Sequence, residues 1–320
     1  MPIDFDQCDL EETRRVNRRL AHLPRLRLHH PIHRTVMQSL TKLGGRLMAD
    51  LPRKFGIEAE DRTVGALGGT ARVRILRAPG PPRGVHLHIH GGGWTIGDAQ
   101  MDDPINAQLA AERGITVVSV DYRLIPAAPF SAVLDDCEIA ARWALEEGLD
   151  ELAGERMTIG GESAGAHLAA VTLLRLRDRA RDFARVAGAA LTYGCYDLGA
   201  TNRRRHAGPE TLVLYGPTLT RLADKATGLE PEARRAPSLS PLHADLDRLP
   251  PALFIVGDKD PLQEDSELMH AKWAEWSGQA ELIIVPEAPH GFNHMRTSVA
   301  RKANAYVRAW IARRHESDAP

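Results

Sequence analysis

The sequence predicts an α/β protein in which helices cover both faces of a mostly parallel sheet. Strand-like and helix-like segments alternate from about residue 60 to the C-terminal end, as they do when strands are joined by crossover helices. Residues 115–120 form a near-continuous β-branched run, which is typical of a parallel strand buried on both faces. A chain of 320 residues is long enough to bury a full core.

The predicted elements follow one another in a regular order. Strands are expected at residues 71–77, 85–90, 115–120, 157–159, 186–193, 252–256 and 281–285. Helices are expected at residues 103–113, 132–147, from 164 onward, 262–276 and 297–312. Gly148 directly follows the second helix, where a glycine commonly ends a helix.

Two segments fall outside this alternation. Residues 1–55 are expected to be helical, and residues 197–248 form an insertion with one helical patch at about 210–222. A structureless loop of that length is improbable in a compact domain. We therefore expect the insertion to pack with the N-terminal helices as a two-part cap on a main domain of residues 56–320.

The N-terminal segment is unusual in charge. No acidic residue occurs from Thr13 to Ala49, while nine Lys or Arg residues accumulate there. A solvated basic helical face is the favoured interpretation. A lid that contacts an anionic substrate or partner is the first alternative, and a transit peptide is disfavoured by the acids that precede Thr13.

The overall composition limits the classes of partner and compartment. With a formal net charge of −1, the protein as a whole is not attracted electrostatically to nucleic acid or to a membrane surface. No run of 18 apolar residues predicts a membrane span, and no signal peptide is expected. Three widely spaced cysteines without a C-x-x-C motif fit a cytoplasmic protein without a disulfide framework. The oligomeric state stays open, a homodimer included.

Residues 161–165, Gly-Glu-Ser-Ala-Gly, match the G-x-S-x-G nucleophile elbow between a predicted strand and a predicted helix. The turn forces Ser163 into a sparsely populated backbone conformation that exposes its Oγ. A Cβ at Gly161 or Gly165 would collide with the chain beside the serine. The motif alone also fits an ordinary glycine-rich turn. Whether Ser163 is a nucleophile therefore depends on whether the chain also supplies a base, an acid and oxyanion donors.

A serine nucleophile needs a base, and the base of such an elbow follows a later strand. His290 comes directly after the strand that ends at Val285, and Gly291 permits a tight turn there. His290 is therefore the predicted base, with His294 as the alternative.

The base needs an acid that orients it. Asp260 follows the strand that ends at Val256, although a residue before Pro261 could also be only a helix cap. Asp258 is the main alternative to Asp260. Asp265 and Glu264 lie inside the following helix and are disfavoured.

Backbone donors for an oxyanion are expected in the loop His90-Gly91-Gly92-Gly93-Trp94. Three glycines leave N–H groups unobstructed, and the residue after the nucleophile, Ala164, supplies a further donor. Loss of one such donor typically costs about 3 kcal/mol of barrier. The alternative is a flexible glycine loop.

Three histidines, His86, His88 and His90, alternate along one predicted strand and share a face. No cysteine or acid cluster joins them in the sequence, so we expect a packed, hydrogen-bonded strand and no metal site.

These motifs together resemble the hormone-sensitive-lipase-like family of α/β-hydrolases, in its bacterial carboxylesterase branch. The resemblance rests on His90-Gly91-Gly92-Gly93-Trp94, Asp121-Tyr122-Arg123-Leu124, Gly161-Glu162-Ser163-Ala164-Gly165, Asp260-Pro261-Leu262 and His290-Gly291-Phe292. It implies an eight-stranded sheet under a helical cap, a triad of Ser163, Asp260 and His290, and oxyanion donors at Gly92, Gly93 and Ala164, with Gly91 as a further candidate.

The chain departs from the family pattern at three places. Ala127 stands where the family usually has Glu, and Ser131 replaces a later proline. Glu162 stands where Asp is commoner beside the nucleophile, and Ala166-His167 replace a frequent Gly-Asn. None of these changes removes a catalytic group, but the last two could alter the pocket.

The resemblance implies a serine carboxylesterase that acts on short to medium acyl esters without a cofactor or metal. An amidase or acyl-peptide hydrolase with the same triad is the alternative enzyme. A ligand-binding member, as in the plant gibberellin receptors, is disfavoured because those have lost the catalytic histidine and this chain keeps His290. Aromatic residues that could line the substrate pocket, or equally pack in the core, are Trp94, Tyr193, Tyr196, Tyr215 and Phe292.

Overall fold

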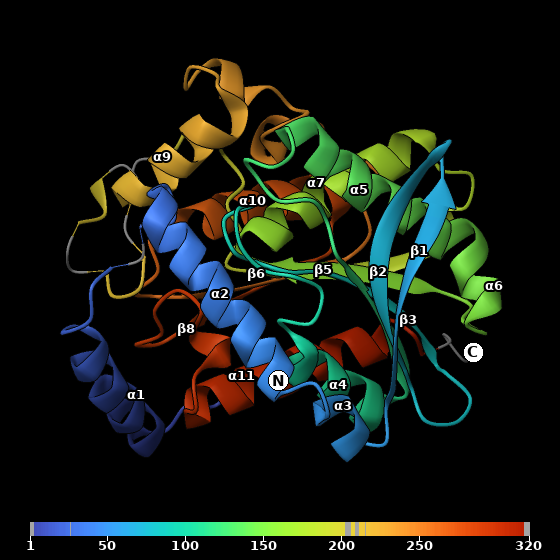
Figure 1. Cartoon of the computed structure of the whole chain (residues 1–320), viewed down its shortest axis with the longest axis horizontal. Coiled ribbons are helices and arrows are strands. Elements are labelled where there is room, and N and C mark those ends of the chain that lie inside the picture. The colour runs from blue at the N-terminus through green and yellow to red at the C-terminus, as the bar shows by residue number, and fades with distance from the viewer. Residues whose placement is uncertain (1–2, 26, 202–205, 209–210, 215, 317–320) are drawn as a thin grey trace.

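The computed structural model describes residues 3–25, 27–201, 206–208, 211–214 and 216–316, and a single eight-stranded sheet organises them (Figure 1). The strands are β1 (Glu58–Ala66), β2 (Gly69–Arg77), β3 (Gly84–Ile89), β4 (Ile115–Val120), β5 (Met157–Glu162), β6 (Val186–Thr192), β7 (Ala252–Gly257) and β8 (Ala280–Val285). Their order in the sheet is β1-β2-β4-β3-β5-β6-β7-β8. β2 pairs antiparallel with β1 and β4, and all the other pairs are parallel.

Helices cover both faces of this sheet, as the alternation predicts. The longer helices are α1 (Gln7–Leu20), α2 (Pro31–Leu47), α4 (Asp103–Arg113), α5 (Phe130–Trp143), α7 (Ala164–Arg179), α9 (Gly216–Thr227), α10 (Gln263–Ser277) and α11 (Ser298–Arg313). Short turns of α-helix are α3 (Leu51–Lys54) and α6 (Leu149–Glu151). Figure 1 shows α5, α7 and α10 on one face, and α4 and α11 on the other.

The core lies in two layers, one on each side of the sheet. Along β7, Phe254 packs with Trp273 of α10 on one face. Leu253 packs with Trp310 of α11 on the opposite face. Successive side chains of a strand point to opposite faces, so a strand buried on both sides must be apolar throughout. This is why the parallel strands could be predicted from their composition.

The structure confirms the α/β class and the predicted strands, and it adds β1, which the sequence pattern did not reveal. β1 is an edge strand, and most of its residues are exposed. An exposed edge strand needs no apolar alternation, so its composition carries little signal. The helical patch expected at about 210–222 is found as α9, and residues 210 and 215 of that prediction lie outside the described residues.

The described part of the N-terminal 55 residues contains three helices, as expected from their composition. None of the described helices is both long enough and apolar enough to cross a bilayer. All three cysteines are free thiols, with Cys8 exposed and Cys137 and Cys195 buried.

Candidate active site

Ser163 lies in a sharp turn between β5 and α7, at the carboxyl end of the parallel strands. Its backbone has φ 54° and ψ −117°, a strained conformation for a residue with a side chain. An added Cβ at Gly165 would lie 1.9 Å from the Ile89 carbonyl oxygen, and one at Gly161 would lie 2.3 Å from the same oxygen. Only glycine therefore lets β3 pass this close beneath the serine.

A chain of two hydrogen bonds connects Ser163 to a buried carboxylate. Nε2 of His290 lies 2.9 Å from Ser163 Oγ, and Nδ1 of the same ring lies 2.8 Å from Asp260 Oδ2. Asp260 is fully buried and also accepts a bond from the Leu262 N–H at 2.8 Å. The carboxylate is thus fixed on both oxygens, and it can hold the imidazole with its Nε2 toward the serine.

The alternative candidates for the base and the acid do not take part in the hydrogen bonds between Ser163, His290 and Asp260. His294 bonds to Glu162 rather than to Ser163. The His290 ring is bonded by Asp260 rather than by Asp258, whose backbone N–H donates to Val285. Asp265 accepts bonds from the backbone N–H groups of Tyr196 and Asp197 on the other side of α10.

The loop after β3 brings its glycines to the same cavity as Ser163 and His290. Gly92 has φ 107° and Gly93 has φ 59°, and a Cβ at Gly92 would lie 2.2 Å from the Ile96 carbonyl oxygen. Ala164 is the first residue of α7, where backbone N–H groups have no partner within the helix. The three glycines and Ser163 therefore border one cavity, and Ala164 directly follows the serine at the start of α7.

Two aromatic rings brace this loop, and the sequence motifs contained both residues without showing this role. The His90 ring stacks on Tyr122 with centroids 4.1 Å apart, and its Nδ1 lies 2.8 Å from the Gly91 carbonyl oxygen. The Tyr122 hydroxyl donates to the carbonyl oxygens of His90 and Gly91 at 3.0 and 3.2 Å. These contacts orient the peptide groups of the loop, so the D-Y-R-L motif supports the glycine motif directly.

A mostly apolar cavity of about 180 Å³ opens above Ser163. Its apolar wall comes mainly from three segments, and the residues are Leu28, Ile96, Met101, Val213, Leu214, Leu219 and Leu222. Tyr193 also lines the cavity, as expected, and its ring lies 4.7 Å from that of His290.

The other aromatic candidates do not line this cavity. Trp94 is buried in the core against Phe130 and His167. Phe292 packs behind Tyr193 in the core beside α11. Both rings thus take the second of the two places that the sequence left open, since a large aromatic ring gains much by complete burial. Tyr196 is likewise buried, against Phe254, and Tyr215 lies outside the described residues.

The histidines of β3 are each hydrogen-bonded to protein groups, as expected for a packed strand. His86 Nδ1 lies 2.9 Å from Thr158 Oγ1, and His88 Nε2 lies 2.7 Å from Asp102 Oδ2. Burial lowers the pKa of His86 well below its usual value. Burial also lowers the pKa of His88, but the hydrogen bond to Asp102 and the charges of Asp102 and Glu162 together outweigh this effect and raise it.

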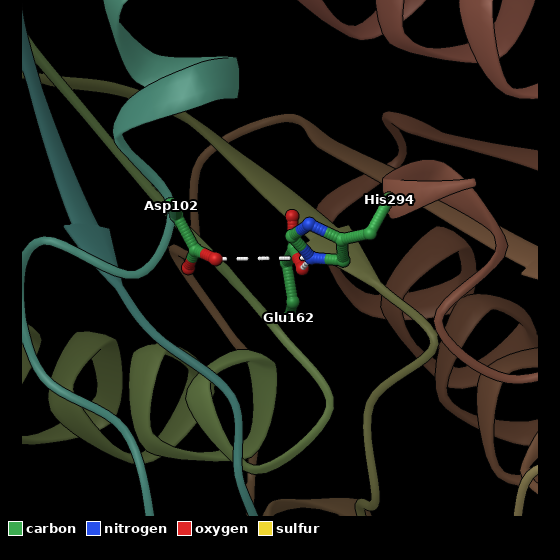
Figure 2. Close-up of side chains that lie close together, drawn as sticks. All are labelled: Asp102, Glu162 and His294. Carbon is green, nitrogen blue, oxygen red and sulfur yellow. Dashed lines mark hydrogen bonds and ion pairs between the residues drawn. The ribbon is translucent and has the colours of Figure 1, made fainter. Parts of the chain in front are cut away.

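Behind the nucleophile, Glu162 belongs to a network of charged side chains. Figure 2 shows the His294 ring close to Glu162 and facing Asp102. Its Nε2 lies 2.5 Å from Glu162 Oε2 and 3.7 Å from Asp102 Oδ1. Glu162 also accepts bonds from the Tyr193 hydroxyl at 2.9 Å and from the Asn293 amide at 2.5 Å. The elbow, the histidine loop and the start of α4 are thereby tied together.

The three charged groups of Figure 2 have the residue types of a metal site, with ligand atoms within 4.8 Å of one another. Burial lowers the pKa of His294, but the charges and hydrogen bond of its two acidic neighbours outweigh this and raise it to about 9. A histidine must lose its proton to bind a metal. We therefore interpret the cluster as an ion-paired network in which the imidazolium is the cation.

The sheet and the position of Ser163 at the carboxyl ends of its strands define an α/β-hydrolase. A family model described as "alpha/beta hydrolase fold" matches residues 86–294, which is more than half of the chain. The chain therefore belongs to this family, and within it to the hormone-sensitive-lipase-like group whose motifs it carries.

Solved structures of esterases resemble the chain over almost its full length. A hyperthermophilic esterase from the archaeon Pyrobaculum calidifontis is 28% identical with a TM-score of 0.82, covering 98% of this chain and 99% of that one. A bacterial heroin esterase is 27% identical with a TM-score of 0.84, covering 96% and 98%. A thermostable carboxylesterase cloned from a metagenomic library is 26% identical with a TM-score of 0.74, covering 88% and 98%. The chain is accordingly a carboxylic ester hydrolase.

Proposed function

We propose that this chain is a serine carboxylesterase that hydrolyses short to medium acyl esters through an acyl-enzyme. The observation that carries the proposal is the hydrogen-bonded series from Ser163 through His290 to Asp260, with bonds of 2.9 and 2.8 Å. A serine hydroxyl is a weak nucleophile at its own pKa, and a base held in this geometry activates it.

In the first half of the reaction, Ser163 Oγ attacks the ester carbonyl carbon while His290 Nε2 takes the hydroxyl proton. The carbonyl oxygen becomes an oxyanion, for which the N–H groups of Gly92, Gly93 and Ala164 are the donors that we assign. Asp260 stabilises the imidazolium that forms. His290 then protonates the leaving alcohol, and the acyl group stays on Ser163.

In the second half, a water molecule takes the place of the alcohol. His290 accepts a proton from this water, the oxygen attacks the acyl carbon, and the same donors bind the new oxyanion. Collapse of this intermediate returns the proton to Ser163 Oγ and releases the carboxylic acid. The apolar cavity of about 180 Å³ supports an acyl or alcohol group of limited size.

We further propose that residues 1–55 and 197–248 act as a two-part cap on the catalytic part of residues 56–320. Leu28 from the first segment and Leu219 and Leu222 from the second line the cavity. Lys225 of α9 donates a hydrogen bond to the His29 carbonyl oxygen at 2.5 Å, which connects the two segments.

The test is hydrolysis of p-nitrophenyl esters from acetate to palmitate, with Ser163→Ala as the control. We expect rates to be highest for acyl chains of about two to eight carbons, because a cavity of this size limits chain length, and to vanish in the variant. Matched amide substrates separate an esterase from an amidase with the same triad. No Ser163-dependent rate on any ester or amide would leave only a binding role.

Two further features of the protein remain proposals. Three free thiols without a disulfide are typical of a reducing compartment, and we propose a cytoplasmic location. β8 is an open edge of the sheet and exposes Ile284, so we propose a homodimer that covers this edge.

A further inference from the structure

The helix α2 presents its apolar side to solvent. Five aliphatic residues recur on one side of it at spacings of three and four, and they are Ile32, Val36, Leu40, Leu43 and Leu47. At 3.6 residues per turn they fall within an arc of about 80°. Each is between 51 and 79% exposed. We call these five residues the outer face of α2.

The inner side of the same helix holds it on the protein through Met37, which packs against the core, and otherwise through polar or small residues. The Gln38 amide donates to the Gly97 carbonyl oxygen at 3.1 Å, and its own oxygen accepts from the Gly97 N–H at 2.7 Å. Gly45 is buried, and an added Cβ there would lie 3.0 Å from Gln100 Oε1. A surface helix normally has the opposite arrangement, with apolar residues inward. The exposed stripe is therefore not explained by the packing of this chain.

The charged residues of α2 itself, Arg34, Lys42 and Arg46, are all basic. Lys42 and Arg46 are exposed on α2 itself, and the whole stretch from Thr13 to Ala49 contains nine cations and no carboxylate side chain. A helix with an apolar face beside basic residues is the type that binds in the plane of an anionic lipid surface. The apolar face enters the acyl region, and the cations remain among the head groups.

A second copy of the chain fits this surface less well. A two-fold contact places the same patch of each protomer against the other. Such a contact through α2 would bring the two acid-free basic segments together, and like charges across an interface oppose association.

We propose that the outer face of α2 docks the protein on an anionic lipid–water interface. Figure 1 shows α2 on the outside of the molecule, with its N-terminal end close to α9. Leu28, just before α2, lines the cavity above Ser163, and Gln38 holds the segment that follows the oxyanion loop. The docked face is thus attached to the entrance of the active site, where an ester dissolved in the lipid phase would arrive.

The proposal is tested by binding rather than by hydrolysis, so its failure is distinct from failure of the esterase function. The full-length protein is sedimented with phosphatidylcholine vesicles, alone or with phosphatidylglycerol added. We expect binding to the anionic vesicles that weakens with salt, and weaker binding to the neutral ones. The double variant Leu40→Gln/Leu43→Gln should lower the partition constant by at least about tenfold, a change equivalent to about 1.4 kcal/mol.

Two comparison variants separate the contribution of the basic residues and the effect of removing any exposed leucine from the contribution of the outer face. Lys42→Glu/Arg46→Glu should weaken binding to anionic vesicles and leave the weak binding to neutral vesicles unchanged. Leu268→Gln removes an exposed leucine of α10 and should bind as the wild type does. All variants should hydrolyse a soluble short-chain ester at the same rate, which shows that they are folded.

Four results would overturn the proposal. The first is wild-type protein that does not sediment with anionic vesicles. The second is equal binding to neutral and anionic vesicles, and the third is an outer-face variant that binds as the wild type does. The fourth is a self-associated protein that binds no vesicles and that the outer-face variant dissociates, since a second copy would then cover α2.

Discussion

At the scale of single residues, the site depends on orientation more than on the presence of reactive groups. The protein has 14 histidines, yet only His290 is held between a buried carboxylate and the Ser163 hydroxyl. Tyr122 and His90 likewise orient the glycine loop after β3, through hydrogen bonds and ring stacking.

Asp260→Asn should lower kcat by about 10⁴-fold while the protein stays folded. The amide oxygen can still accept from Leu262, but the amide stabilises the imidazolium poorly and favours the wrong tautomer. Initial rates on p-nitrophenyl acetate, with circular dichroism as the folding control, test this expectation. Asp258→Asn is the matched control and should keep most of the activity. Full activity in Asp260→Asn would transfer the orienting role to Asp258.

The His294 network should make stability depend on alkaline pH. The pKa of His294 is raised from an ordinary value of 6.5 to about 9 by its acidic neighbours. A raised pKa in the folded state means that the stabilisation is fully present below pH 6.5 and is lost as pH rises through about 9. Urea unfolding at several pH values between 6 and 10 should show this loss in the wild type.

His294→Gln keeps a hydrogen-bonding side chain but cannot titrate. Its free energy of unfolding should therefore fall less between pH 6.5 and 9.5 than that of the wild type. Equal pH dependence in the two proteins would show that His294 does not carry the effect. The pKa of His88 is also raised, chiefly through Asp102, so part of the pH dependence should remain in the variant.

At the scale of elements, glycines have opposite roles in two helices. Gly165, in the first turn of α7, leaves no room for a Cβ, because the Ile89 carbonyl oxygen is 1.9 Å from that position. Gly44, near the end of α2, has no atom within 4 Å of that position. Gly165→Ala should therefore abolish folding or activity. Gly44→Ala should raise stability by about 0.5–1 kcal/mol, because alanine restricts the unfolded chain. Thermal unfolding and activity of both variants test these two expectations. A stable, active Gly165→Ala protein would contradict the close approach of β3 to α7.

The helix α9 should limit the length of the acyl chain. Leu219 is buried and lines the cavity above Ser163. Leu219→Ala should move the preferred p-nitrophenyl ester toward longer acyl chains, and it should cost about 2 kcal/mol of stability through the space it leaves. Leu229→Ala, at an exposed leucine outside the cavity, is the control and should leave the profile unchanged. An unchanged profile for Leu219→Ala would place the acyl group elsewhere.

At the scale of the whole molecule, the two edges of the sheet differ. β1 and β8 are both edge strands, but the exposed residues of β1 are mostly charged or polar, whereas β8 exposes the apolar Ile284 at 42%. If a homodimer covers β8, Ile284→Lys should shift the protein to monomer, because the charge would have to lose its water in the interface. Analytical ultracentrifugation of the two proteins measures this, and a monomeric wild type would contradict the proposal.

The order of the elements and the candidate active-site motifs were accessible from the sequence. Buried parallel strands such as β4 must be apolar along their whole length, and the elbow around Ser163 requires glycines on both sides. These are local demands, so the local sequence records them. β1 was missed for the same reason, since an exposed edge strand makes no such demand.

The sequence alone determined the α/β class, the eligible nucleophile and the two loops from which its partners could come. Only the tertiary structure decided which acid the histidine contacts, that Trp94 and Phe292 belong to the core, and that Asp102 and Glu162 share the His294 imidazolium. It also showed that the apolar side of α2 faces outward. Such choices depend on distances between residues far apart in the chain. A sequence pattern records what each segment needs locally, but it does not record which segment packing will place beside it.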